Sequence, residues 1–493
     1  MTGSTLRVVL LKPSKYRPDG FVERFRWGYM PNGTLPHIRS LTPPRLDGVP
    51  LSVHCIDECV ESDTTYLRLL HARDTPTLLA LVGVQSHQIH RALDLGLLAR
   101  RGGSLVVLGG PHALTCSTDE VMRAGISIAA AEAEDVWLDI LRDALSGVLR
   151  PRYAAGSNGR LAAQPIHPPS LAQLRRYVVP MVGLYPARGC PYRCTFCSVP
   201  QIAGTRVTAQ PIDVTLESIR RAKAAGVQVV LFTSDNFNKY REAPELLERM
   251  IDERLTIPFM AQCDAQIGKQ EDLISLLGRA GCFQMFIGVE SSNRQTLKAI
   301  HKFHNDPANY AAIAALCARH GIASHFSNII GFPWETQAEI SARIREIDTE
   351  LRPDWASFFI LCPMPGTVQY EDFRLDGVIV ERNLDRFDAT CLTWQHRTLT
   401  APQLQESMYG AYRRFYSVGR IRRRMINLPD VAAKAQRLGS QLFHLFCGYA
   451  RIHPLSGGVW RVERDHERDY LPAREAAMGA RYLPLPSSTG VAP

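Results

Sequence analysis

Between about residues 181 and 400 the sequence alternates six times between a short apolar run and an amphipathic segment, and this alternation constrains the fold most strongly. The helical segment after Thr336 opens with the capping box Thr336-Gln337-Ala338-Glu339. Strands that alternate with helices form parallel sheets, and six units are too few for a closed eight-unit barrel. We therefore expect an α/β fold with a partial (β/α)6 barrel over residues 181–400. The predicted strands end near Arg188, Thr233, Cys263, Val289, Ile330 and Leu361.

Three other regions differ from this barrel in composition and periodicity. Residues 1–150 also alternate strand and helix signals, which predicts a Rossmann-like domain with a parallel sheet. Residues 151–180 are rich in Pro, Ala and Arg without periodicity, which indicates a linker. Residues 401–493 are predicted to be helical, with a disordered tail from Leu483.

Hydrophobicity and charge narrow the class of protein. No apolar run approaches the ~20 residues of a membrane span, and the apolar stretch near the N-terminus is too short for a signal peptide. We therefore expect a cytoplasmic protein that does not enter a membrane. Residues 401–493 hold 14 Arg and Lys against 7 Asp and Glu. A solvated helical surface explains this excess more simply than a nucleic-acid site does.

Three of the twelve cysteines lie together in the spacing Cys-x3-Cys-x2-Cys: Cys190, Cys194 and Cys197. Three cysteine thiolates can ligate three irons of a [4Fe-4S] cluster and leave the fourth iron open for chemistry. A zinc knuckle is the alternative, but zinc sites usually pair two Cys-x2-Cys halves. The next cysteine, Cys263, is far away in the sequence.

This motif, with the aromatic Phe196 before the last cysteine, resembles that of the radical S-adenosylmethionine (SAM) superfamily. The resemblance implies a [4Fe-4S] cluster on Cys190, Cys194 and Cys197. It also implies that SAM chelates the open iron and is cleaved reductively to a 5′-deoxyadenosyl radical. A small electron-transfer protein such as flavodoxin or ferredoxin would then be a partner.

Three other barrel-strand ends resemble SAM-binding segments of the same superfamily. The segment after the second strand would hold the SAM amino group, the end of the fourth would reach the ribose, and the end of the fifth would contact adenine. A structural role is the alternative for each residue alone. The implied SAM contacts are Phe196, Ser234, Asp235, Asn236, Glu290, Asn328, Gly331 and Glu335.

The N-terminal region has a Gly-Gly-Pro-His turn between a predicted strand and a helix, and it lacks the G-x-G-x-x-G pattern of a nicotinamide site. Such a turn ahead of a radical SAM barrel resembles the subgroup with a cobalamin-binding domain. The implied cobalamin contacts are Ser86, Gly109, Gly110, Pro111 and His112.

Two features depart from that subgroup's usual pattern or from cobalamin domains in general. Alanines stand where the subgroup has the glycines of Gly-Glu-Gly-Glu, in Ala131-Glu132-Ala133-Glu134. The Asp-x-His-x-x-Gly cobalt-ligand motif is absent, as is common in this subgroup. His87 as an axial ligand and a vestigial domain without cobalamin both stay open.

The resemblance favours an enzyme that methylates an unactivated carbon of a small-molecule metabolite. Radical cyclisation, rearrangement or oxidation is the first alternative, and an iron-sulfur protein that modifies nucleic acid is the second. No catalytic side chain is evident. Cys362 follows the sixth predicted strand and is a weak candidate for a hydrogen-atom donor.

Overall fold

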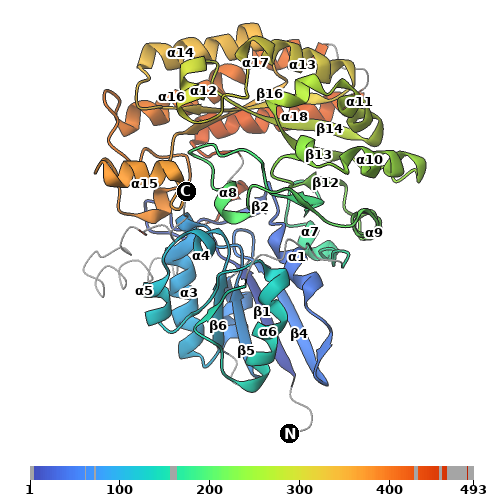
Figure 1. Ribbon diagram of the computed structural model, residues 1–493, viewed down its shortest axis with the longest axis vertical. Coiled ribbons are helices and arrows are strands. Elements are labelled where there is room, and N and C mark those ends of the chain that lie inside the picture. The colour runs from blue at the N-terminus through green and yellow to red at the C-terminus, as the bar shows by residue number, and fades with distance from the viewer. Residues whose placement is uncertain are drawn as a thin grey trace.

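Figure 1 shows two α/β parts stacked along the long axis of the molecule, with the N-terminal part below. The computed structural model describes residues 5–61, 63–71, 74–155, 161, 164–426, 431–454, 458–462 and 486. The predicted tail from Leu483 lies outside the described residues, apart from Pro486. Among the residues described, no helix is both long enough and apolar enough to cross a bilayer.

The N-terminal part is a seven-stranded sheet in the order β3-β4-β1-β5-β6-β7-β8, parallel except for β3. The strands are β1 (Leu6–Lys12), β3 (Arg45–Leu46), β4 (Val49–Asp57), β5 (Thr77–Leu81), β6 (Leu105–Gly109), β7 (Ser127–Ala129) and β8 (Arg152–Tyr153). The helices are α1 (Thr34–Leu41), α2 (Asp63–His71), η1 (Ser86–Gln88), α3 (Ile89–Arg101), α4 (Pro111–Thr115), α5 (Asp119–Arg123) and α6 (Ala133–Ser146). The last strand, β8, extends this sheet into the predicted linker, which also contains the short helix α7 (Leu171–Leu174).

Both faces of the first sheet are buried. Val9 and Leu11 pack into a core with α2, α3 and α5, whereas Val8 and Leu10 pack into a second core with α1 and α6. Alternating residues therefore face two different cores, which explains the continuous apolar runs in the sequence.

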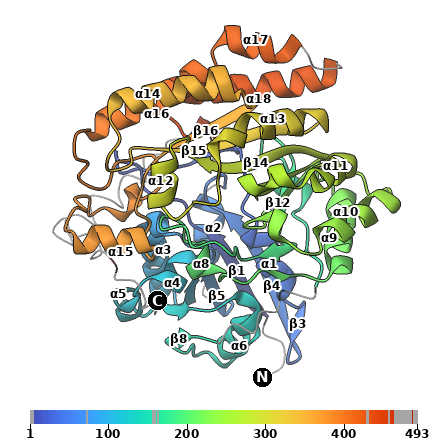
Figure 2. The same cartoon turned by 45° about the horizontal axis from the view of Figure 1, so that its top comes forward.

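The second part is a six-stranded parallel sheet in the sequential order β9-β12-β13-β14-β15-β16. These strands are β9 (Met181–Leu184), β12 (Val229–Phe232), β13 (Phe259–Asp264), β14 (Cys282–Glu290), β15 (Ala323–Ile330) and β16 (Trp355–Ile360). The main helices on its outer side are α9 (Ile212–Ala224), α10 (Ala243–Asp252), α11 (Glu271–Ala280), α12 (Arg294–Ala299), α13 (Tyr310–Arg319) and α14 (Gln337–Glu346). Figure 2 shows these helices around the curved sheet, and the predicted fold class is confirmed.

Short elements follow several of these strands and helices. They are β10 (Ala187–Arg188), α8 (Val199–Ile202), β11 (Thr208–Ala209), η2 (Phe237–Lys239), η3 (Ala265–Lys269), η4 (Pro307–Asn309), the π-helical η5 (Ile347–Leu351), α15 (Val368–Leu375) and η6 (Leu384–Arg386). The first barrel strand ends at Leu184, earlier than predicted, because Pro186 has no amide hydrogen for a ladder. The chain then forms β10, which pairs antiparallel with β11 in a separate two-stranded ribbon.

The C-terminal region covers the edge of the second sheet. It contains α16 (Ala401–Phe415), α17 (Val418–Ile426), α18 (Val431–Ala450) and β17 (Gly458–Arg461). The amide of Phe358 donates to the Tyr412 hydroxyl (3.1 Å), and the amide of Ala356 donates to the Tyr416 hydroxyl (3.0 Å). Two tyrosines thus satisfy backbone groups of the edge strand β16.

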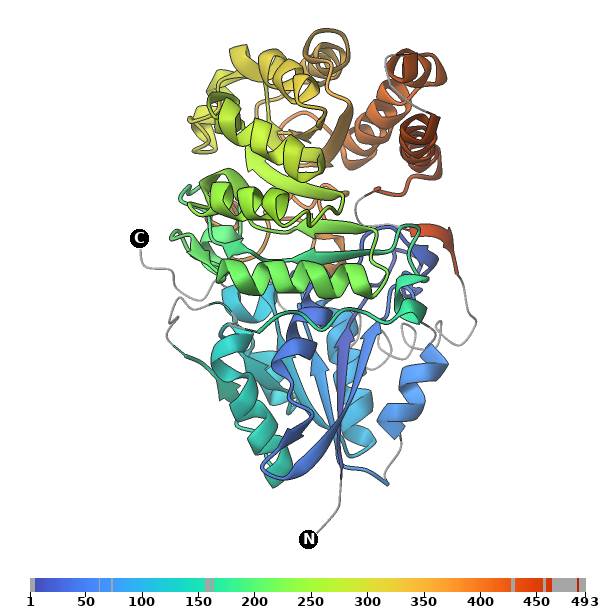
Figure 3. The ribbon, with the colours of Figure 1, turned by 90° about the vertical axis from the view of Figure 1, so that its right-hand side faces the viewer.

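An unpredicted pairing joins the two ends of the chain. The strand β17 pairs antiparallel with β2 (Phe25–Gly28), and Figure 3 shows the red strand beside the blue one. Next to β2, the Tyr29 ring stacks on Phe443 of α18 with 4.8 Å between centroids. The C-terminal region is therefore fixed to the N-terminal part as well as to the barrel.

Candidate functional site

The three predicted cluster ligands lie in one loop, residues 189–198, here called the cysteine loop, between β10 and α8. Gly189 has φ +94°, and a Cβ there would lie 2.3 Å from the Arg206 carbonyl oxygen. Only glycine fits this turn. The Cys194 thiol is buried, whereas Cys190 and Cys197 are partly exposed.

The segment after β12 holds the cysteine loop. The amide of Ala187 donates to the Ser234 hydroxyl (3.2 Å), and the amide of Gly189 donates to Oδ2 of Asp235 (2.7 Å). The Asn236 Nδ2 lies 3.5 Å from the Cys190 sulfur. These three side chains, predicted as SAM contacts, thus position the start of the loop, and SAM binding by them stays a prediction.

A buried ion pair lies behind the same loop. Glu290, at the end of β14, accepts a hydrogen bond from Nζ of Lys302 at 2.7 Å, and both side chains are about nine-tenths buried. Burial would lower the pKa of Lys302, but Glu290 and the neighbouring Cys194 hold it above its usual range. Burial raises the pKa of Cys194 to about 11 and that of Cys197 to about 12. Lys302 therefore places a positive charge beside thiols that bind iron only as thiolates.

Lys302 is not among the predicted site residues, because it lies outside every motif of the sequence. Its Nζ also lies 5.8 Å from the ring centroid of Phe196, which packs in an apolar cluster with Ile300 and Leu361. Only the folded chain shows that this lysine is next to the cysteine loop.

The predicted adenine-contacting residues build the turn after β15. Oε2 of Glu335 accepts from the amides of Gly331 (2.8 Å) and Phe332 (3.1 Å). Oε1 of Glu335 lies 2.7 Å from Arg343, which also donates to the Glu290 carbonyl oxygen (3.1 Å). The side-chain amide of Asn328 donates to the Phe326 carbonyl oxygen (3.0 Å). These side chains are bonded within the fold, and SAM contact by them stays a prediction.

A cavity of about 220 Å³ lies between the two parts of the molecule. From the first part it is lined by the ends of β5, β6 and β7 and by α1 and α6, with Gly109, Gly110 and Pro111 at its wall. From the second part it is lined by Tyr185, Arg188, Ile202, Ala203 and Asp235. The cavity therefore adjoins the start of the cysteine loop.

The Gly-Gly turn packs so closely against the chain after β5 that a side chain at Gly110 would not fit. Gly110 has φ +131°, and a Cβ there would lie 2.2 Å from the Val84 amide nitrogen. Ser86 and His112, by contrast, do not line the cavity: the Ser86 hydroxyl and Nδ1 of His112 lie 2.9 Å apart. Burial lowers the pKa of His112 to about 4, so this imidazole is neutral at pH 7.

His87 and Cys362 also lie away from the cavity lining. Burial, with Lys15 nearby, lowers the pKa of His87 to about 3. The buried Cys362 thiol lies 3.8 Å from the Thr393 hydroxyl, in an apolar core shared with the first sheet, and burial raises its pKa to about 12. This environment favours a packing role, and a role as hydrogen-atom donor stays a prediction.

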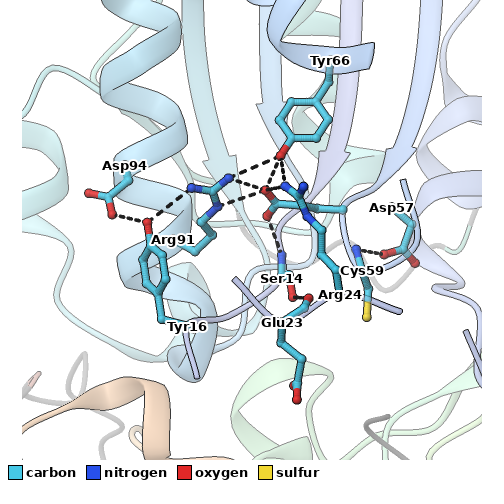
Figure 4. A network of polar contacts seen from close by, with 10 residues as sticks. Ser14, Tyr16, Glu23, Arg24, Asp57, Cys59, Tyr66, Arg91 and Asp94 are labelled. Atoms are coloured by element: carbon cyan, nitrogen blue, oxygen red, sulfur yellow. Dashed lines mark hydrogen bonds and ion pairs between the residues drawn. The ribbon is translucent and has the colours of Figure 1, made fainter. Parts of the chain in front are cut away.

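A buried ionic network holds the chain after β1, where it faces the barrel (Figure 4). Oε1 of Glu58 accepts from Arg91 (2.6 Å), Arg24 (3.1 Å) and the Tyr66 hydroxyl (2.5 Å), while Oε2 accepts from the amide of Ser14 (2.9 Å). Burial alone would raise the pKa of Glu58, but the two guanidinium groups lower it to about 2.

The segment fixed by this network contains Lys15, whose ammonium forms an ion pair with Asp388 of the second part. The network thereby supports one of the contacts between the two parts.

Comparison with known proteins agrees with this geometry. Residues 184–347 match the model of the Radical SAM superfamily. The chain is 27% identical to the bacteriochlorophyllide d C-12(1)-methyltransferase of Chlorobaculum tepidum, over 69% of this chain and 74% of that protein.

Two solved structures show the same two-part fold. The radical SAM methyltransferase TsrM of Kitasatospora setae, with tryptophan and a SAM analogue bound, matches with a TM-score of 0.62 and 16% identity over 96% of this chain and 99% of that one. The cobalamin-dependent SAM radical enzyme OxsB, with aqua-cobalamin bound, matches with a TM-score of 0.60 and 14% identity over 97% of this chain and 76% of that one. Residues 184–347 of the chain are therefore similar to the Radical SAM superfamily, and the two-part fold is that of these two structures.

Proposed function

We propose that this protein is a cobalamin-dependent radical SAM enzyme that methylates an unactivated carbon of a small molecule. The observation that supports it most is the position of the interdomain cavity. Tyr185, Arg188 and Asp235 line this cavity. The cysteine loop begins at Gly189, the residue after Arg188. A reactive group in the cavity and another at the cysteine loop would be close enough to act on one substrate.

The donor set of the cysteine loop fits a [4Fe-4S] cluster. Three thiols lie in one short loop, and Asn236 and Lys302 lie beside them. Among the described residues, no three His, Cys, Asp or Glu side chains converge on one point as the ligands of a single ion would. A cubane takes one cysteine per iron, so its ligands need not converge in that way.

The interdomain cavity fits part of a cobalamin. Its inner wall is apolar, with Ile38, Val107, Val136 and Trp137, as a buried heterocyclic group requires. Ala131 and Ala133, which stand where the subgroup has glycines, line the cavity, and it persists with their methyl groups in place. We infer that the Gly109-Gly110-Pro111 turn binds the cofactor through its backbone.

When bound, the cluster would supply the electron that cleaves SAM, and cobalamin would supply a methyl group to a carbon radical. The protein's own residues hold the site in place and exclude water. Ser234 and Asp235 fix the start of the cysteine loop, and the ammonium of Lys302 compensates the charge of the ligating thiolates. Enclosure between the two parts protects reactive species from solvent. We place the enzyme in the cytoplasm, with flavodoxin or ferredoxin as the electron donor.

The products of SAM test this proposal. The anaerobically reconstituted protein, with hydroxocobalamin, reductant, methyl-labelled SAM and cell extract, should release S-adenosylhomocysteine and 5′-deoxyadenosine in about equal amounts per methylated product. Deoxyadenosine without S-adenosylhomocysteine would favour cyclisation or oxidation instead. S-adenosylhomocysteine alone would mean methyl transfer without a substrate radical.

A further inference from the structure

Arg188 connects the cysteine loop to the N-terminal part of the molecule. It ends β10, two residues before Cys190. Its Nη1 lies 2.9 Å from Oε2 of Glu132 and 3.1 Å from Oε1 of Glu134, and its Nη2 lies 3.0 Å from Nε2 of His37. Glu132 and Glu134 begin α6, and His37 belongs to α1. One guanidinium therefore contacts two helices of the other part.

Most of this ionic group is buried. The side chains of Arg188 and Glu134 are 12% and 8% exposed. Nε2 of His37 lies 3.0 Å from Oε1 of Glu134. Burial would raise the pKa of Glu134, but His37 and Arg188 lower it to about 2. The contacts of Arg188 with Glu132, Glu134 and His37 fix the position of the guanidinium between the two parts.

The same residues form part of the cavity wall. His37, Glu132, Glu134 and Arg188 all line the interdomain cavity, as does Asp235, which accepts the amide of Gly189. A ligand that fills this cavity contacts α1 and α6 on one side. On the other side it contacts a guanidinium joined through two peptide units to the first cluster ligand.

We propose that Arg188 is a positioning residue that couples the filling of the interdomain cavity to the placement of the cysteine loop. The identities of the two cofactors rest on the proposed function; the coupling rests on the contacts of Arg188. Because equilibrium coupling between two sites is reciprocal, a filled cavity should make the protein hold the cluster more tightly, and the cluster should tighten binding in the cavity by the same factor.

The test measures both directions of this coupling without turnover. The first measurement is the rate at which a chelator removes iron from the oxidised, reconstituted cluster, with and without saturating cyanocobalamin. The second is the Kd of cyanocobalamin for cluster-loaded and cluster-free protein. For the wild type we expect slower removal of iron when cyanocobalamin is bound, and a Kd about fivefold or more lower for cluster-loaded protein, the lower end of typical allosteric coupling. For Arg188→Met, the ratio of the two iron-removal rates and the ratio of the two Kd values should both fall close to one.

Two further variants separate coupling from simple stability. Arg188→Lys keeps the charge but not the fork that reaches three partners, and it should retain an intermediate ratio. Arg176→Met removes an arginine that also links the chain before the barrel to the N-terminal part, through Glu61 at 3.1 Å, but does not line this cavity. It should keep the full wild-type ratios.

The measurements distinguish a failure of the proposed function from a failure of the role of Arg188. Wild-type protein that holds no cluster or binds no cyanocobalamin would contradict the proposed function. Wild-type protein that binds both without mutual effect, or Arg188→Met protein that keeps the wild-type ratios, would overturn the role of Arg188.

Discussion

Glu58 offers a quantitative test of the buried network in Figure 4, through the variant Glu58→Gln. The carboxylate is fully buried and contacts two guanidinium groups, a hydroxyl and a backbone amide. Glutamine keeps the shape of the side chain but removes its charge. Arg24 and Arg91 would then lose the negative charge of Glu58 that lies between them.

The expected cost follows from the pKa of Glu58. The fold lowers this pKa from 4.5 to about 2. Since a tenfold change in proton affinity is worth about 1.4 kcal/mol, the ionised carboxylate stabilises the fold by roughly 3 kcal/mol at pH 7. Breaking a buried ion pair by removing one partner costs roughly 3–5 kcal/mol, which agrees.

The stability that Glu58 contributes should fall at low pH. Because the folded-state pKa is depressed, the contribution of Glu58 is complete above pH 4.5 and is lost as the pH falls toward 2. At pH 3.5 the wild type should have lost about 1.4 kcal/mol of it, while Glu58→Gln has no such group to protonate. The difference in free energy of unfolding between the two proteins should therefore shrink by that amount between pH 7 and pH 3.5.

Urea titrations read out by pulsed hydrogen exchange of peptides from β1 and β4 would measure this difference in the first sheet. Glu61→Gln is the matched control: its pair with the half-exposed Arg176 should be worth less than about 1 kcal/mol. A Glu58→Gln variant as stable as the wild type, or a difference that does not change with pH, would refute this account of the network.

Three further substitutions test the site. Replacing any one cysteine of the cysteine loop with Ala should abolish the charge-transfer absorption of the reconstituted cluster and all SAM cleavage, whereas Cys263→Ala, in the buried barrel core, should preserve both. Gly110→Ala should weaken cyanocobalamin binding about tenfold or more, since backbone strain of this kind costs about 1–3 kcal/mol, while Gly147→Ala, also at positive φ but with open space around it, should leave the Kd unchanged. Cys362→Ala should keep the same product and turnover if the thiol only packs, and a changed product would support a hydrogen-donating role.

Elements with strong periodicity were predictable from the sequence. Apolar residues recur three and four positions apart at 134–145, 403–416 and 431–449, and these segments form α6, α16 and α18 within two residues. Five of the six barrel strands end within one residue of the predicted position, because a polar residue marks the end of β12, β13 and β14 and a glycine or proline closely follows β15 and β16. The first strand differs because Pro186 interrupts it.

Contacts between distant residues were not predictable. Nothing in the sequence near Lys302 shows that it lies beside Cys194, and Arg188 precedes a motif without showing that its partners are Glu132 and Glu134. Glu335 illustrates a second difficulty: a carboxylate after a strand end can bind a ligand or hold a turn, and its bonds to Gly331 and Phe332 are visible only in the fold.

The pairing of β2 with β17 has a consequence for how the chain folds during synthesis. Gly28 pairs with Gly458, so about 430 residues separate the two strands. At a typical rate of about 5–20 residues per second, the ribosome needs roughly 20–90 s to produce the second strand after the first has emerged. The N-terminal part can assemble its central sheet in that time, long before the ladder partner of β2 is made. This pairing therefore forms late, and a chain that stops before Gly458 leaves β2 without this ladder and its edge available for association with other chains.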